Sequence, residues 1–186
     1  MVNRTPSYFV VLSIFLPLCL LACSKGKTSN EIKIADEKYV VTVPKGLDFQ
    51  CKIIPYAANC KNFGLIDMSD TDAKICTAET KSTEFTIVIQ KQSEKNIRNG
   101  SNDPGADMTG AWTDCKDARI IDRKTVKVDG DTAIDSVLTS PLGKGAARSI
   151  VNKDISLLSF ALPRMGGENS QEIASFSSSM RPANGK

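Results

Sequence analysis

Apolar and polar residues alternate along much of the chain, a pattern typical of β-strands that bury one face. The clearest run is residues 83–90, in which Phe85, Ile87 and Ile89 point one way and the residues between them point the other way. Runs of the same kind, rich in β-branched and aromatic residues, occupy 31–34, 39–43, 49–54, 118–128, 132–139, 147–152 and 155–162. The chain is therefore predicted to fold mainly as β-strands.

Two turns are predicted between these runs. Asp129-Gly130 lies between alternating segments, and a tight hairpin needs a positive φ at both of its central residues. Residues 140–145 (SPLGKG) form the second predicted turn. Residues 143–148 (GKGAAR) begin like a dinucleotide-binding loop, but they lack its third glycine and lie between strands. We interpret them as a turn, because no helix N-terminus is predicted there to hold a phosphate.

A helix is predicted over residues 169–180. Asn169 and Glu172 make a start similar to a capping box, and Ile173 and Phe176 fall on one apolar face. Residues 69–72 could cap another short helix, whereas 74–77 could equally be a strand, and the sequence leaves both open. Together these elements predict an α+β fold, a mostly antiparallel twisted sheet with a C-terminal helix packed on it.

The first apolar run, residues 8–21, is 14 residues long. That length suits a signal peptide and falls short of the ~20 residues that a spanning helix needs. The run ends in Leu20-Leu21-Ala22-Cys23, which resembles the lipobox of bacterial lipoproteins. The resemblance implies cleavage before Cys23, a lipid on that cysteine, and a protein anchored to a membrane. The alternatives are an uncleaved anchor helix and an ordinary secretory signal.

This interpretation divides the chain into a signal peptide (1–22), a lipidated cysteine with a flexible tether (23–30) and one domain (31–183). Ser24 follows the cysteine where aspartate would signal retention in the inner membrane, so we expect the periplasmic face of the outer membrane of a Gram-negative bacterium. The leader holds one of the 24 basic residues and none of the 21 acidic ones, which leaves the rest at +2. So small a charge argues against nucleic acid as a partner.

Four cysteines remain once Cys19 and Cys23 are set aside, and an even number in an oxidising compartment predicts two disulfides. They are Cys51, Cys60, Cys76 and Cys115. Three pairings are possible. We favour Cys51–Cys60 with Cys76–Cys115, because a short loop costs less entropy to close. A zinc site is the weaker alternative, since the chain has no C-x-x-C pair and no histidine.

Candidate catalytic chemistry is sparse. Without histidine the chain cannot build the common Ser-His-Asp or Cys-His arrangements, nor an HExxH zinc site. Acidic clusters at Asp67, Asp70 and Asp72 and at Asp129 and Asp131 do not have the EF-hand spacing, and we interpret them as solvated turns. We therefore expect no enzyme activity, no cofactor and no bound metal.

The segment 91–117 is long for a structureless loop and rich in Gly, Asn, Asp and Pro. Loops of this length are often functional or partly helical. We predict a partner-binding surface within 91–114, with Asn99, Asp103, Asp107 and Trp112 as candidate contacts. For Trp112, burial beside a disulfide is the alternative.

Two segments resemble the PsbP/Mog1-like α/β-sandwich families. One is the V-x-V-P-x-G strand end at 41–46, and the other is the closing strand 157–162 followed by the helix 172–180. The lipobox, tether and strand entry are also similar to type VI secretion immunity lipoproteins, which bind toxins that act on peptidoglycan. The resemblance implies a twisted antiparallel sheet with flanking helices and a non-catalytic role.

The expected function is therefore that of a lipid-anchored protein that binds another protein in the periplasm, in its narrowest form an immunity or inhibitor protein against a toxin or cell-wall hydrolase. A module that binds a small ligand or assists envelope assembly is the second hypothesis. An envelope enzyme that uses only carboxylates, tyrosines or lysines is the third.

Overall fold

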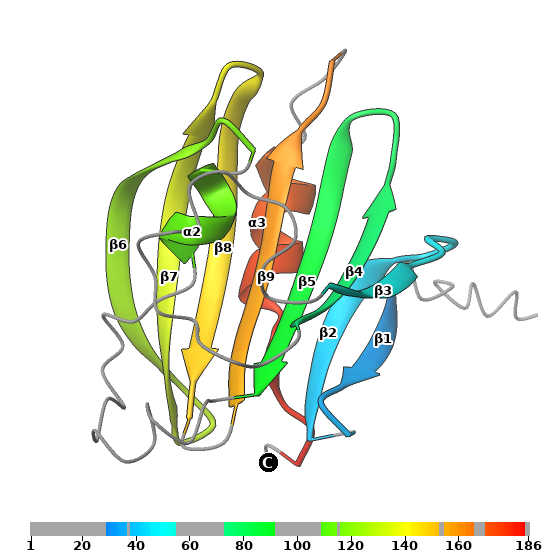
Figure 1. Ribbon diagram of the computed structural model, residues 1–186, viewed down its shortest axis with the longest axis vertical. Coiled ribbons are helices and arrows are strands. Elements are labelled where there is room, and N and C mark those ends of the chain that lie inside the picture. Colours follow the sequence, from blue (N-terminus) through cyan, green and yellow to red (C-terminus); the bar gives the residue numbers. More distant parts are fainter. Residues whose placement is uncertain are drawn as a thin grey trace, which may run out of the picture.

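The structure is a computed structural model that describes residues 29–36, 38–54, 73–91, 109–114, 116–152, 155–165 and 170–184 (Figure 1). Within these ranges the strands form two sheets, and every strand pair is antiparallel. A C-terminal helix packs against both sheets. The predicted α+β class is confirmed.

The larger sheet has seven strands in the order β3-β4-β5-β9-β8-β7-β6. Their bounds are β3 (Gln50–Ile54), β4 (Ala73–Glu79), β5 (Thr83–Lys91), β6 (Arg119–Val128), β7 (Asp131–Ser140), β8 (Gly143–Val151) and β9 (Ile155–Pro163). Strands β6 to β9 follow one another as neighbours, and β9 then pairs with β5, which precedes them in the sequence. The short helix α2 (Thr109–Asp114) lies between β5 and β6 in the chain.

The smaller sheet has the order β1-β2-β10, with β1 (Ser29–Ile34), β2 (Tyr39–Pro44) and β10 (Arg181–Pro182). It lies beside helix α3 (Ser170–Ser178) on the same face of the larger sheet, and α3 packs against β2, β8 and β9. Val41 and Val43 of β2 share one buried cluster with Phe85 of β5 and Phe176 of α3. The rings of Phe85 and Phe176 meet edge to face, with centroids 4.9 Å apart. This core therefore lies between the two sheets.

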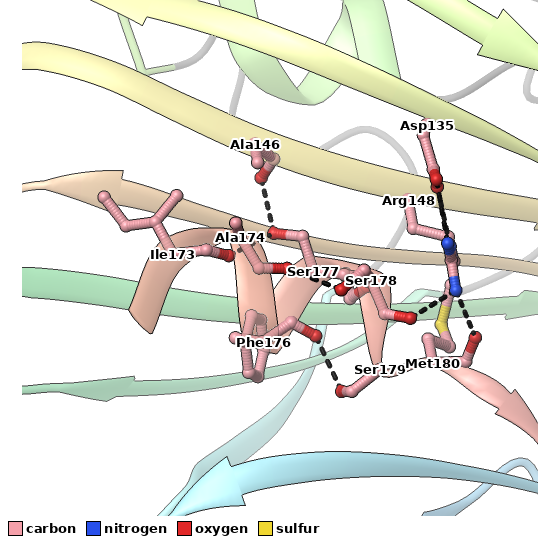
Figure 2. A network of polar contacts seen from close by, with 11 residues as sticks. Asp135, Ala146, Arg148, Ile173, Ala174, Phe176, Ser177, Ser178, Ser179 and Met180 are labelled. Carbon is pink, nitrogen blue, oxygen red and sulfur yellow. Dashed lines mark hydrogen bonds and ion pairs between the residues drawn. The ribbon is translucent and has the colours of Figure 1, made fainter. Parts of the chain in front are cut away.

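Hydroxyl groups at the end of α3 fasten the helix to both sheets. Ser177 Oγ donates to the carbonyl of Ala146 on β8 at 2.8 Å (Figure 2). Ser179 Oγ accepts from the backbone N–H of Thr42 on β2 at 2.9 Å and donates to its carbonyl at 3.2 Å. The helix is thus attached to both sheets by directional bonds as well as by apolar packing.

The opposite face of the large sheet carries a second apolar cluster, and α2 lies over it against β6 and β8 (Figure 1). Leu138, Leu158 and Phe160 belong to this cluster and are fully buried. Because both faces are covered, residues 156–163 of β9 are buried without interruption. This explains why Leu157 and Leu158 follow each other directly in β9, each buried on a different face of the sheet.

Most of the predicted elements are confirmed. Asp129 and Gly130 have φ values of 49° and 96° and form the hairpin between β6 and β7. Residues 74–77, for which the sequence left helix and strand open, belong to strand β4. Residues 69–72 lie outside the described residues. Within the described chain, no helix is both long and apolar enough to cross a membrane.

The predicted turn over 140–145 is too long. Gly143 and Gly145 already belong to β8, and only Pro141 and Leu142 separate it from β7. Gly145 lies very close to strand β9: an added Cβ would be only 2.6 Å from Leu162 Cδ2. The glycine is therefore explained by close side-chain packing in the sheet and not by a turn.

Candidate functional site

The turns at one end of the large sheet surround a hollow of about 790 Å³. The β4–β5 turn, the β7–β8 turn, the end of β9 and the segment after α2 contribute to it, and the two turns and the β9 end lie at the top of Figure 1. We call it the turn-end hollow. Its lining residues are Lys81, Glu84, Lys116, Asp117, Ser140, Pro141, Leu142, Leu162, Pro163, Arg164 and Met165.

Two large apolar side chains are exposed at this hollow. Leu142 is 51% exposed and Met165 is 83% exposed. Leu142 occupies the two-residue β7–β8 turn, where Ser140 Oγ accepts from its N–H and donates to the Gly143 carbonyl, at 3.3 and 3.1 Å. Because Leu142 lies in the turn and not in a strand, its side chain does not pack on a face of the sheet.

Arg164 ties the end of β9 to the β4–β5 turn. Its backbone N–H donates to the Ser82 carbonyl at 2.8 Å, and its guanidinium donates to the Thr80 carbonyl at 3.3 Å. The same guanidinium forms an ion pair with Glu79 at 2.6 Å. Met165 therefore directly follows a residue that these contacts hold in place, although the Met165 side chain is itself exposed.

A second ion pair joins Lys116 to Glu84 at 2.5 Å and links the segment after α2 to β5. Lys116 is positioned by its backbone N–H, which donates to the Thr113 carbonyl at 2.9 Å. Lys81 also lines the hollow and forms no ion pair with any residue that the structure describes. The site thus presents exposed apolar groups beside charged groups, an arrangement typical of protein-binding surfaces.

The structure brings only part of the predicted loop to this site. Lys116 and Asp117, at the end of segment 91–117, line the hollow. Asn99, Asp103 and Asp107 lie outside the described residues, and Trp112 lies in α2 with its side chain outside the description. Sequence reasoning missed Leu142 and Met165. The available signal was a large apolar residue inside a turn, which is unusual because turns favour small and polar residues.

The described disulfide joins Cys51 to Cys76. The preferred Cys51–Cys60 and Cys76–Cys115 pairing is therefore wrong. Cys51 and Cys76 are opposite each other in the β3–β4 register, and their Cα atoms are 4.0 Å apart. Because strand pairing places the two residues opposite each other, the length of the loop between two cysteines does not determine which of them pair. Cys23, Cys60 and Cys115 lie outside the described residues.

The acidic residues near the β6–β7 turn have a structural explanation. Asp131 accepts a hydrogen bond from the Tyr39 hydroxyl at 2.7 Å, which links β7 to β2, and Asp129 occupies the turn itself. Burial raises the pKa of Tyr39 from 10.0 to about 12, and the hydrogen bond to Asp131 is the second largest cause of this increase. Among the described residues, no group of three acidic or cysteine side chains is arranged to hold a metal, and Asp67, Asp70 and Asp72 lie outside them.

Comparison with solved structures finds a similar fold in the solution structure of cyanobacterial PsbP (CyanoP) from Synechocystis sp. PCC 6803. The TM-score is 0.51 at 12% sequence identity, and the match covers 83% of this chain and 92% of that one. The fold is PsbP-like. No protein-family model and no curated protein matches the chain. At this identity the likeness concerns the fold alone.

Proposed function

We propose that the chain is a lipid-anchored lipoprotein of the Gram-negative envelope that binds another protein and catalyses no reaction. The observation that carries the binding role is the turn-end hollow, where Leu142 and Met165 are exposed beside charged side chains. Exposed apolar side chains on a folded domain cost solvation free energy, and covering them drives association. The PsbP-like fold is compatible with a binding domain of this kind.

The narrowest form of the proposal is an immunity or inhibitor protein that blocks a periplasm-acting toxin or wall hydrolase. Three sequence features support it: the lipobox ending in Cys23, the short tether 23–30, and the absence of histidine. Ser29 and Asn30 belong to β1, so the tether after Cys23 is residues 24–28, which would span roughly 12 Å on average. The domain would then stay close to the membrane surface, where such a toxin acts on the adjacent wall.

The experiment is affinity capture from crosslinked envelopes of the native host, with the full chain carrying a C-terminal tag. The test variant combines Leu142→Ser and Met165→Ser, which removes both exposed apolar groups while the core stays intact. The matched control is Ile121→Ser, since Ile121 is 55% exposed on edge strand β6. We expect one stoichiometric protein with the wild type and the control, and its loss with the double variant.

A toxin or wall hydrolase as the captured protein would support the immunity form. Capture of the same partner by the double variant would exclude the turn-end hollow as the binding surface. Recovery of no stoichiometric protein from any sample would overturn the protein-binding proposal itself. Acylation is tested separately, by mass analysis of the mature N-terminus, where an unmodified Cys23 would contradict the anchor.

A further inference from the structure

A second cavity, of about 230 Å³, lies in the seam between the two sheets, next to β1. We call it the seam pocket. Its lining residues are Ile32, Lys33, Ile34, Ala35, Asp36, Phe49, Cys51, Lys74, Cys76, Ile87 and Ile89. They come from β1 and the turn after it on one side, and from β3, β4, β5 and the segment before β3 on the other.

The pocket lies beside α3, and no residue of the helix lines it. The helix packs against β2, β8 and β9, and Phe176 marks its boundary toward the pocket. Phe49, which lines the pocket, stacks on Phe176 with centroids 6.2 Å apart. Beyond this pair of rings no described helix separates β1 from the large sheet, so the apolar surfaces of both sheets face an open volume.

The walls are apolar. Ile87 and Ile34 are buried there, Ile32 and Ile89 are half-buried, and the Cys51–Cys76 disulfide adds a polarizable surface. Apolar groups bind to such surfaces because binding removes both from water. The volume is below the 300–1,000 Å³ of ordinary ligand sites, so the pocket fits part of one hydrocarbon chain better than a drug-sized molecule.

One side of the pocket carries a cation next to an exposed apolar residue. Lys74 lines the pocket, and Ile53, which is 69% exposed, is its register partner on edge strand β3. Residues directly opposite in an antiparallel pair point to the same face, so the two side chains are neighbours. Lys74 forms no ion pair with any described residue. Lys33 and Asp36 also line the pocket, at β1 and the turn after it.

The β1–β2 turn that borders the pocket is held in an unusual conformation. Ala35 and Asp36 have φ values of 54° and 55°, and the turn is closed by the Lys38 N–H, which donates to the Ala35 carbonyl at 3.2 Å. A left-handed alanine is strained, because its Cβ comes close to the following carbonyl oxygen. Such strain persists only where the surroundings hold the backbone in place, and both residues of this turn line the pocket.

We propose that the seam pocket binds the hydrocarbon tail of a single-chain anionic amphiphile, a long-chain fatty acid, with the carboxylate at Lys74 and the adjoining methylenes against Ile53. The apolar walls take the tail end, and the free cation selects a negatively charged head over a neutral one. This site is distinct from the turn-end hollow, and the inference does not rest on the protein-binding proposal.

The test uses the full chain in isolated envelopes, labelled with palmitic acid that carries a photoreactive diazirine in its chain. Isolated envelopes are used so that the probe is not built into the lipid of Cys23. We expect crosslinks on peptides that contain β1, β4 or β5. Excess unlabelled palmitate should suppress them, and hexadecanol, which has the same tail and no charge, should compete about threefold less well. Crosslinks confined to other peptides would overturn the proposal.

Two variants sharpen the test. Ile32→Trp fills the pocket from strand β1 and should lower labelling about tenfold, the equivalent of displacing two buried methylene groups. Its control is Ile121→Trp on the distant strand β6. Lys74→Gln keeps the walls and should weaken competition by palmitate about threefold while competition by hexadecanol stays unchanged.

The Lys74→Gln variant changes an exposed side chain, so it remains decisive if Ile32→Trp does not fold. Equal palmitate competition in Lys74→Gln and the wild type would exclude Lys74 as the carboxylate site. Unchanged labelling of a folded Ile32→Trp protein would exclude the pocket. The Leu142→Ser, Met165→Ser double variant should label like the wild type, which separates this inference from the proposed function.

Discussion

Arg148 and Asp135 form a two-point ion pair between β8 and β7, with Nε donating to Oδ1 at 2.6 Å and Nη2 donating to Oδ2 at 2.8 Å (Figure 2). The remaining nitrogen, Nη1, donates to the carbonyls of Ser178 and Met180. A cation at the end of a helix also stabilises the helix dipole. One side chain thus joins two strands of the large sheet to the C-terminus of α3.

We expect Arg148→Ala to lower the free energy of unfolding by about 3 kcal/mol. The loss lies at the lower end of the range for buried pairs, because the Asp135 side chain is 35% exposed and can recover some hydration. Arg148→Lys should cost about 1–2 kcal/mol, since an ammonium cannot reproduce the planar fork. Urea unfolding measures both. Lys144→Ala, an exposed change on the same strand, is the control, and an equal loss there would contradict the assigned role.

Removing the Cys51–Cys76 bridge by a double change to alanine should cost about 3 kcal/mol, because its sequence separation is 25 residues. The measurement is urea unfolding of oxidised wild type against the double variant. Peptide mass analysis without reduction should find Cys51 linked to Cys76, and Cys60 linked to Cys115 as the remaining pair. A peptide that links Cys51 to Cys60 would refute the register-based pairing.

Gly145→Ala should destabilise the domain by about 1–3 kcal/mol, because the new methyl group overpacks a closed site. The added Cβ would lie 2.6 Å from Leu162 Cδ2 and 2.7 Å from the Ala161 carbonyl oxygen, and the second atom is backbone that cannot move aside. Gly110→Ala in α2 is the matched control, since its nearest atom is Arg123 Nη2 at 4.0 Å. Thermal unfolding should show a lower midpoint for Gly145→Ala alone.

Tyr39 should make stability fall in alkaline solution. Its pKa is about 12 in the folded protein against 10.0 without burial and the Asp131 bond, so the folded state holds the phenol proton more tightly. The contribution is complete below pH 10 and is lost as the pH rises toward 12. Tyr39→Phe should cost about 1 kcal/mol at pH 7, because it removes the hydrogen bond to Asp131.

The same variant should also show a smaller loss of stability between pH 9 and pH 11 than the wild type. Urea unfolding at the two pH values provides the comparison. Parallel losses in the wild type and in Tyr39→Phe would show that other groups cause the alkaline effect.

The elements that the sequence predicted well are those determined by interactions between residues close together in the chain. The β6–β7 hairpin follows from Asp129-Gly130, two residues that tolerate the positive φ of its turn. Helix α3 follows from the spacing of Ile173 and Phe176, both buried in the structure. Strand β5 follows from its run of β-branched and aromatic residues, Phe85 to Ile89. In each case neighbouring residues supply the determining interaction, so no knowledge of distant partners was needed.

The pairings and the sites depend on contacts between distant residues. Cys51 meets Cys76 through strand register, and Gly145 is required by a side chain of β9. The turn-end hollow combines two turns, the end of β9 and the segment after α2, which are far apart in the sequence and meet only in the folded domain. The sequence by itself determined the strands, the main hairpin and the C-terminal helix. Only the tertiary structure decided the disulfide and both cavities, because these depend on which surfaces meet.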